Sequence, residues 1–224
     1  MTRLAIFDCD GTLVDSGHTI YSALAEAFDL HGAALPPPRE SRRVIGLSLT
    51  EAMAALLPQA EADEHAALAE TYKSCFQRAR LEGRVEEPLF EGVLDLLDHF
   101  EREGWLLAVA TGKSDRGLRH CLESHGIHAR FVSLQTADRH PSKPAPAMAL
   151  AAIAEAGATP ERSIVVGDTA FDIGMACAAG TFGIGAAWGY HSTEELLAAG
   201  AFAVAQSPGE VAEIAARAME TASG

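Results

Sequence analysis

Two aspartates lie one residue apart at the end of a short apolar run near the start of the chain. The run LAIF, residues 4–7, leads into Asp8 and Asp10, and Gly11 and Thr12 follow. Carboxylates placed so close together repel each other and resist burial unless a counter-charge is present. A divalent cation with a preference for oxygen ligands is the usual counter-charge. The pair therefore indicates a metal site, and one carboxylate could also act as a nucleophile.

Further polar side chains follow other apolar runs in the same way. Thr111 follows LLAVA, and Lys143 lies in the loop after RFVSLQ. Asp168 follows SIVVG, and Asp172 comes one helical turn later. If the runs are parallel strands, their carboxyl ends meet at one edge of a sheet, where open α/β sheets bind ligands. The set suits phosphoryl transfer, because one carboxylate can attack phosphorus, another can move protons, and the lysine and threonine can hold phosphoryl oxygens.

The order of helical and extended segments predicts an α/β fold. After VEEPLFEG, helical patterns alternate with apolar strands, as in GVLDLLDHFEREG before WLLAVAT and PAMALAAIAEAG before SIVVGD. Glycine repeatedly stands just past a helix, as a C-terminal stop does. This alternation is typical of βαβ units, so we expect a Rossmann-like, three-layer core with a parallel sheet between helices.

A helical segment interrupts this core directly after the first strand. From Gly17 to about Gly83 the chain is rich in alanine, has helical spacing and shows no convincing strand pattern. We expect residues 1–15 and 86–224 to form the α/β catalytic core and residues 16–85 to form an inserted α-helical cap. An insertion at this point lies above the carboxyl ends of the strands, so a lid is its natural role.

Composition excludes several classes of protein. With 48% hydrophobic and 21% charged residues among 224, the chain can fill a core. Its net charge of −14 argues against nucleic acid or an anionic membrane as the main partner, and no apolar stretch reaches the ~18 residues of a membrane span. The N-terminus shows no signal peptide, and the four cysteines form no CxxC pair, so we expect reduced thiols and a cytoplasmic protein. The nine histidines match no zinc-ligand spacing.

Four short motifs occur in a characteristic order along the chain: DCDGTLVDS, ATGKS, SKPAP and VGDTAFD. Together they resemble the motifs of the haloacid dehalogenase superfamily of phosphohydrolases, and most closely its phosphoglycolate-phosphatase-like branch with a helical cap of the C1 type. The resemblance covers nearly the whole chain. It implies a Mg²⁺-dependent phosphatase that hydrolyses a small phosphate monoester, phosphoglycolate-like or a sugar phosphate, through an aspartyl-phosphate. The implied partner is a small phosphorylated metabolite, and we expect a monomer.

The resemblance also implies a role for each catalytic residue. Asp8 would be the nucleophile, and Asp10 would be the general acid and base, with its backbone carbonyl on the metal. Thr111 would hydrogen-bond the transferring phosphoryl group, and Lys143 would orient Asp8 and the phosphate. Dehalogenating branches lack the second aspartate, so Asp10 favours phosphoryl transfer.

The remaining site residues follow from the same resemblance and from the position of the cap. The expected metal ligands are Asp8, Asp10, Asp168 and Asp172, the last either in contact with Mg²⁺ or supporting a residue that is. The expected substrate-binding residues are Gly11, Thr12, Gly112, Arg42 and Arg43. The two arginines and the following IGLSL (Ile45–Leu49) could form a specificity loop, and a solvated basic turn explains the arginines equally well.

Two departures and two alternatives accompany this interpretation. Family members often have glycine and aspartate where this chain has Ser142 and Ala147, and we expect these changes to leave the chemistry intact. A β-phosphoglucomutase-like phosphosugar mutase would use a cap histidine and lysine, for which His18 and Lys73 are the candidates. A non-enzymatic phosphoaspartate signalling module would need neither Asp10 nor the insertion.

Overall fold

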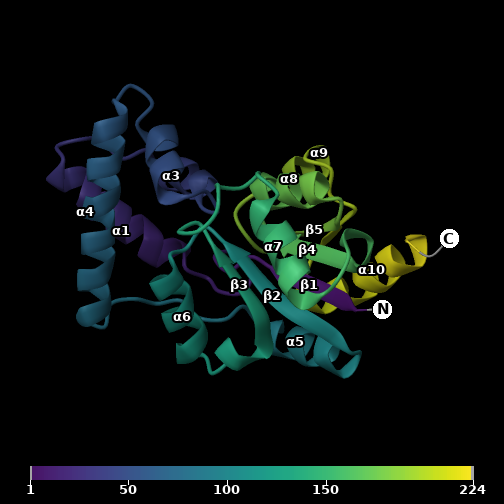
Figure 1. The fold of residues 1–224 in the computed structure, drawn as a ribbon. Helices are drawn as coiled ribbons and strands as arrows, with labels where there is room; N and C mark the ends of the chain where they lie inside the picture. The colour runs from purple at the N-terminus through teal and green to yellow at the C-terminus, as the bar shows by residue number, and fades with distance from the viewer. Residues whose placement is uncertain (1, 223–224) are drawn as a thin grey trace.

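A parallel β-sheet forms the centre of the molecule. The computed structural model describes residues 2–222, so Met1 and residues 223–224 of the predicted core lie outside the described residues. The sheet has six parallel strands in the order β3-β2-β1-β4-β5-β6 (Figure 1). The strands are β1 (Arg3–Phe7), β2 (Trp105–Thr111), β3 (Phe131–Thr136), β4 (Ser163–Gly167), β5 (Phe182–Ala186) and β6 (Ala203–Ala205). This topology confirms the predicted Rossmann-like α/β class.

Helices cover both faces of the sheet because alternate strand residues point to opposite faces. Ala5 and Phe7 of β1 belong to an apolar cluster with the helices at residues 93–102, 115–124 and 208–221, whereas Leu4 and Ile6 belong to a second cluster with the helices at residues 147–156 and 170–179. The LAIF run is apolar at every position because both faces of β1 are buried. The helices of the core are α5 (Val93–Arg102), α6 (Asp115–Ser124), η2 (His128–Arg130), α7 (Ala147–Ala156), η3 (Pro160–Arg162), α8 (Ala170–Ala179), α9 (Thr193–Ala198) and α10 (Pro208–Thr221).

A separate group of helices follows β1 and lies to one side of the sheet (Figure 1). These cap helices are α1 (Gly17–Leu30), α2 (Pro38–Ser41), η1 (Arg42–Val44), α3 (Leu49–Leu56) and α4 (Ala62–Leu81). They bury an apolar cluster of their own around Phe28, Met53 and Leu68. The boundaries proposed for the cap, residues 16 and 85, stay a prediction.

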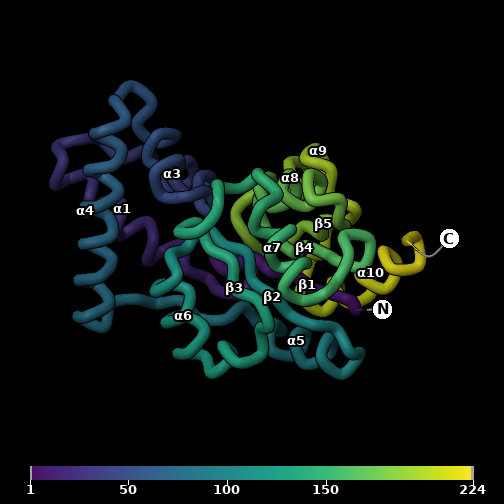
Figure 2. Tube along the Cα trace, in the orientation of Figure 1, coloured from purple at the N-terminus to yellow at the C-terminus, as the bar shows by residue number. Residues whose placement is uncertain are grey.

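Two stretches of chain connect the cap helices to the core, and they run side by side (Figure 2). Asp15 N donates to Pro88 O at 2.8 Å, and Phe90 N donates to Leu13 O at 3.1 Å. This pairing holds the two connecting stretches together. Within residues 2–222, no helix is long and apolar enough to cross a membrane.

Candidate active site

The parallel register brings the predicted catalytic motifs to one edge of the sheet. Phe7 of β1 aligns with Val109 of β2 on one side and with Val166 of β4 on the other. The residues just beyond these positions are Asp8, Thr111 and Asp168, and all three are buried. The sheet therefore gathers side chains that are far apart in sequence. Asp172 joins them from the first turn of α8, and Lys143 from the loop before α7.

Lys143 is an ammonium buried between two carboxylates. Its Nζ lies 2.8 Å from Asp8 Oδ1 and 2.6 Å from Asp172 Oδ1, and each of the three side chains is at most 1% exposed. Burial alone lowers the pKa of a lysine, but the Asp172 and Asp8 carboxylates outweigh it and raise the pKa of Lys143 above its usual range. Lys143 is therefore charged and holds Asp8 in one orientation.

One lysine does not neutralise the acidic cluster around it. Burial raises the pKa of Asp8 to about 7, and the Asp172 carboxylate adds to this effect while Lys143 opposes it. Burial and the Asp172 and Asp8 carboxylates raise the pKa of Asp168 well above its usual range. Asp8 Oδ2 has no hydrogen-bond partner among residues 2–222. The cluster is therefore short of positive charge, and one nucleophilic oxygen is free to bond.

Asp8, Asp168 and Asp172 form a group that could hold a metal ion. Each offers one carboxylate oxygen, and these oxygens lie within 4.8 Å of one another. Asp168 is oriented by Thr12 Oγ1, which donates to its Oδ1 at 2.9 Å, and by Tyr190 N, which donates to its Oδ2 at 2.9 Å. Carboxylate oxygens are hard ligands, and hydrogen bonds from neighbouring groups orient these carboxylates. Because the cluster also lacks positive charge, it fits a hard divalent cation.

Asp172 is fixed by a capping box at the start of α8. Its Oδ2 accepts hydrogen bonds from Thr169 N at 3.1 Å and Thr169 Oγ1 at 2.7 Å, while Oδ1 faces Lys143. Both oxygens of Asp172 are thus already engaged by protein donors. The box explains why this aspartate lies four residues after Asp168, because a helix N-terminus positions the third residue of its first turn toward the cap residue.

Asp10 stands apart from that acidic group. Its Oδ1 lies 2.8 Å from Lys113 Nζ and accepts a hydrogen bond from Ser16 Oγ. Lys113 Nζ also lies 2.6 Å from Glu87 Oε1, and both side chains are more than nine-tenths buried. Sequence reasoning missed Lys113 and Glu87. Lys113 carried a signal, since it lies two residues after Thr111 in the ATGKS motif, whereas Glu87 comes from the second connecting stretch and matched no pattern.

The two predicted glycines allow close approaches of other atoms. Gly11 has φ of 85°, and a Cβ there would lie 2.3 Å from Asp168 Oδ2. A Cβ on Gly112 would lie 2.5 Å from the carbonyl oxygen of Leu47 in the cap segment. Gly11 therefore lets the chain turn beside the acidic cluster, and Gly112 lets the cap segment reach the end of β2. Thr111 Oγ1 accepts from Lys113 N at 3.2 Å.

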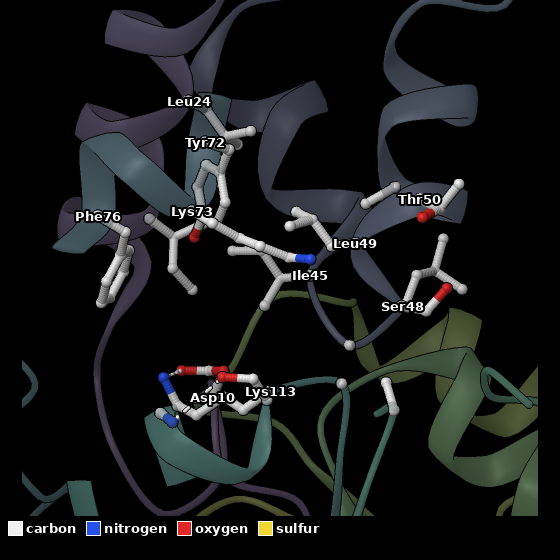
Figure 3. A pocket seen from close by; sticks show the side chains of 18 of the residues that line it. Asp10, Leu24, Ile45, Ser48, Leu49, Thr50, Tyr72, Lys73, Phe76 and Lys113 are labelled. Atoms are coloured by element: carbon white, nitrogen blue, oxygen red, sulfur yellow. Dashed lines mark hydrogen bonds and ion pairs between the residues drawn. The ribbon is translucent and has the colours of Figure 1, made fainter. Parts of the chain in front are cut away.

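A pocket of about 440 Å³ lies between the cap helices and the carboxyl ends of the strands (Figure 3). Asp10, Gly112 and Lys113 line its core side, and Ile45–Leu49 lines part of its cap side. Arg42 and Arg43 are exposed and are not among its lining residues.

Arg43 instead pairs with Glu195 at the start of α9, which joins the cap helices to the core. The assignment of Arg42 and Arg43 to substrate binding stays a prediction. His18, the candidate mutase histidine, is also exposed and outside the pocket lining, whereas Lys73 lines the pocket.

Comparison with known proteins identifies the class of enzyme to which this fold and site belong. The sequence pattern of the family described as "Haloacid dehalogenase-like hydrolase" matches residues 5–186. The chain therefore belongs to the haloacid dehalogenase-like hydrolases, as the four motifs predicted.

Particular relatives were found among known proteins and solved structures. The chain is 36% identical to the "Probable phosphatase IndB" of Dickeya dadantii over 201 residues, 89% of this chain and 87% of that protein. It is 33% identical over 189 residues to the "Tyrosine-protein kinase PtkA" of Mycobacterium tuberculosis, 84% of this chain but only 63% of that protein. It is 31% identical over 196 residues to a "Phosphoglycolate phosphatase" of Pseudomonas putida, 85% of this chain and 71% of that protein. The crystal structure of a "Putative haloacid dehalogenase-like hydrolase" from Bacteroides fragilis superposes with a TM-score of 0.86 at 25% identity, covering 94% of this chain and all of that one.

Proposed function

We propose that the protein is a Mg²⁺-dependent phosphatase that hydrolyses a small phosphate monoester through an aspartyl-phosphate at Asp8. Its enzyme class, a phosphoric monoester hydrolase, follows from the family and from the phosphatases among its relatives. One observation carries the mechanism: Asp8 is buried and held by Lys143 through one oxygen, while its other oxygen has no partner in the described part of the chain.

The first step forms a bond between Asp8 Oδ2 and phosphorus and breaks the bond between phosphorus and the leaving oxygen. Lys143 favours the ionised form of Asp8 and orients it, and it offsets repulsion between this carboxylate and the phosphoryl oxygens. Mg²⁺ held by Asp8 and Asp168, with Asp172 in support, would supply the remaining positive charge at the phosphoryl group.

Asp10 handles the protons in both steps. It donates a proton to the leaving oxygen in the first step, and in the second it takes a proton from the water that attacks phosphorus and releases Asp8. Lys113 and Ser16 hold its carboxylate beside the pocket. General acid–base catalysis of this kind contributes about 10²–10⁴-fold, so most of the acceleration comes from fixed charges and excluded water.

The two alternatives have different support. A signalling module without turnover disagrees with membership of a hydrolase family. A phosphosugar mutase has Lys73 in the pocket, but His18 points to solvent outside it. A hydrolase acting on a phosphoglycolate-like ester or a sugar phosphate is the simpler proposal, and the named phosphoglycolate phosphatases support the first of these substrates.

The test is the release of inorganic phosphate from p-nitrophenyl phosphate, with Mg²⁺ and with excess chelator. We expect Mg²⁺-dependent turnover in the native protein and a loss of at least about 10³-fold in Asp8→Asn. Asp15→Asn is the matched control, because Asp15 is exposed and close in sequence but outside the acidic cluster. Turnover that survives Asp8→Asn, or nitrophenol release without free phosphate, would contradict the proposal.

A further inference from the structure

One stripe of α4 faces the pocket. Tyr72, Phe76 and Arg80 recur every four residues, which places them on one face of the helix, and all three line the pocket. Leu68 and Cys75 lie on the adjoining face and are buried in the apolar cluster of the cap helices. Tyr72 and Phe76 also pack against this cluster, so the helix is anchored there while the two rings and Arg80 line the pocket.

The two aromatic side chains of this stripe lie across the pocket from Asp10, the residue that we propose protonates the leaving oxygen (Figure 3). Figure 3 shows Tyr72 and Phe76 on the cap side of the pocket, across from Asp10 and Lys113 on the core side. The Phe76 ring centroid lies 5.9 Å from Lys113 Nζ, which itself lies 2.8 Å from Asp10 Oδ1. The carbon skeleton of a leaving group that receives its proton from Asp10 can therefore extend into the pocket past Phe76.

Part of the cap side of the pocket is apolar, and Ser48, Thr50 and Lys73 add polar groups there (Figure 3). The Tyr72 and Phe76 ring centroids are 5.8 Å apart, and Leu24, Ile45 and Leu49 add aliphatic surface on the same side of the pocket (Figure 3). A two-carbon acid would leave most of the 440 Å³ filled with water against this apolar surface, at a free-energy cost. Pockets of about 300–1,000 Å³ with apolar walls and a few polar groups hold ring-sized organic ligands.

Arg80 is a cation of the pocket with a buried donor that is unpaired within the described part of the chain. Its Cζ lies 5.2 Å from the Phe76 ring centroid, and its Nε is buried without a hydrogen-bond partner among the described residues. Lys73, by contrast, pairs with Glu70 at 2.6 Å, and Arg116 donates to Gln77 at 3.3 Å. A buried guanidinium N–H without an acceptor is costly, and the planar fork of arginine matches a carboxylate.

We propose that this pocket holds the leaving group of the substrate, and that the substrate is a phosphate monoester whose alcohol carries an aromatic ring, packed on Tyr72 and Phe76, and a carboxylate that accepts from Arg80. The inference rests on the proposed phosphatase function and names its substrate class. It favours a larger and more apolar substrate than phosphoglycolate.

The experiment compares kcat/KM for three esters of primary alcohols: 2-phosphoglycolate, benzyl phosphate and 4-carboxybenzyl phosphate. The last two differ only by a carboxylate on the far side of the ring. We expect benzyl phosphate to exceed 2-phosphoglycolate by about tenfold or more, and the added carboxylate to give about another tenfold. Both ratios are measured on the native protein, so they do not depend on the folding of any variant.

Two variants of α4 assign these preferences to residues. Arg80→Gln should remove the preference for 4-carboxybenzyl over benzyl phosphate, because the carboxylate loses its partner. Phe76→Ala should lower kcat/KM for both aromatic esters about tenfold. Arg78→Gln is the matched control, since Arg78 lies on the same helix, pairs with Glu26 and does not line the pocket. It should retain both ratios.

The outcomes separate this inference from the proposed function. If no ester, including p-nitrophenyl phosphate, is hydrolysed with Mg²⁺, the phosphatase function itself is overturned. If 2-phosphoglycolate is hydrolysed with a higher kcat/KM than benzyl phosphate, the function stands and the aromatic substrate class is overturned. If the carboxylate preference is absent, or survives Arg80→Gln, the assignment of Arg80 is overturned.

Discussion

Lys113 is the counter-ion of two buried carboxylates, so replacing it with methionine should destabilise the fold and impair proton transfer together. Its Nζ lies 2.8 Å from Asp10 Oδ1 and 2.6 Å from Glu87 Oε1. Burial alone would lower the pKa of Lys113, but the Asp10 and Glu87 carboxylates raise it well above its usual range. Lys113 is therefore charged in the folded protein, and Lys113→Met leaves two carboxylates without it.

The size of the effect follows from these contacts. At an effective dielectric constant of about 20, each pair contributes roughly 6 kcal/mol of attraction, and several kcal/mol of desolvation per ion offsets this. Breaking a buried pair by removing one partner costs about 3–5 kcal/mol, which is the loss that we expect for Lys113→Met in free energy of unfolding. Because the variant also releases Asp10, kcat should fall by about 10²-fold or more.

Urea denaturation followed by circular dichroism, together with phosphatase assays, measures both effects. Lys113→Met combined with Glu87→Gln removes one of the two stranded charges, so the double variant should regain about 1–3 kcal/mol relative to Lys113→Met alone. Its kcat should stay low, because Asp10 still lacks its lysine. Lys73→Met is the control: Lys73 lines the same pocket but its pair with Glu70 is exposed, and we expect less than about 1 kcal/mol.

Two results would refute this reasoning about Lys113. One is a stability change in Lys113→Met no larger than that in Lys73→Met, which would mean that the two carboxylates do not depend on Lys113. The other concerns the free energies of unfolding of Lys113→Met, Glu87→Gln and the double variant. If the changes in the two single variants add up to the change in the double variant, the two side chains do not interact.

Three further predictions concern the metal, the pH and the contact between cap and core. Mg²⁺ should raise the melting temperature of the metal-free protein more at about pH 8 than at about pH 6. Burial raises the pKa of Asp8 to about 7, and a proton competes with the ion below that value. Asp168→Asn should remove this rise in melting temperature, and a calorimetric titration of the variant with Mg²⁺ should show no binding heat. The hydrogen bond from Arg43 lowers the pKa of Glu195 to about 2, so its stabilisation is present above the unfolded value near 4.5 and is lost as the pH falls toward 2. The stability difference between native protein and Glu195→Gln should thus be at most about 1 kcal/mol at neutral pH, since the pair is partly exposed, and should vanish at about pH 2; a difference that grows on acidification would contradict it. Ser142→Gly should lower kcat/KM by up to about fivefold, because the Ser142 hydroxyl accepts a 2.7 Å hydrogen bond from the cap backbone that glycine cannot replace, and an unchanged kcat/KM would show that this contact does not hold the cap closed.

The catalytic edge of the sheet could be predicted from sequence because simple rules position it. Parallel strands end on the same side, so Asp8, Thr111 and Asp168 had to meet once their apolar runs were read as strands. The position of Asp172 followed from helical spacing, and the four motifs together identified the family. Local pattern and topology agree at each of these residues.

The cap side of the site could not be predicted in the same way. The spacing of Tyr72, Phe76 and Arg80 is visible in the sequence, but which face of α4 points at the core depends on how the cap helices pack. The sequence alone therefore favours Arg42 and Arg43, which the structure places outside the pocket lining.

Contacts between distant segments were hidden for the same reason. Glu87 meets Lys113 only because the two connecting stretches run side by side, and Ser142 contacts Ser48 of the cap segment only because the cap closes over the core. From sequence alone, Ser142 is a loop change that we expect to leave the chemistry intact. The structure gives this residue a contact with the cap.

The central claim is that Asp8 becomes phosphorylated and that Asp10 then activates water. The most direct test is mass spectrometry of Asp10→Asn after mixing with p-nitrophenyl phosphate and Mg²⁺. Nitrophenol leaves without much help from an acid, so this variant should still phosphorylate Asp8 but hydrolyse the intermediate slowly. We predict one added phosphoryl group that maps to Asp8, is removed by hydroxylamine, and is absent from Asp8→Asn combined with Asp10→Asn. Phosphate release at the native rate without any modified Asp8, or a phosphoryl group on another residue, would contradict the account.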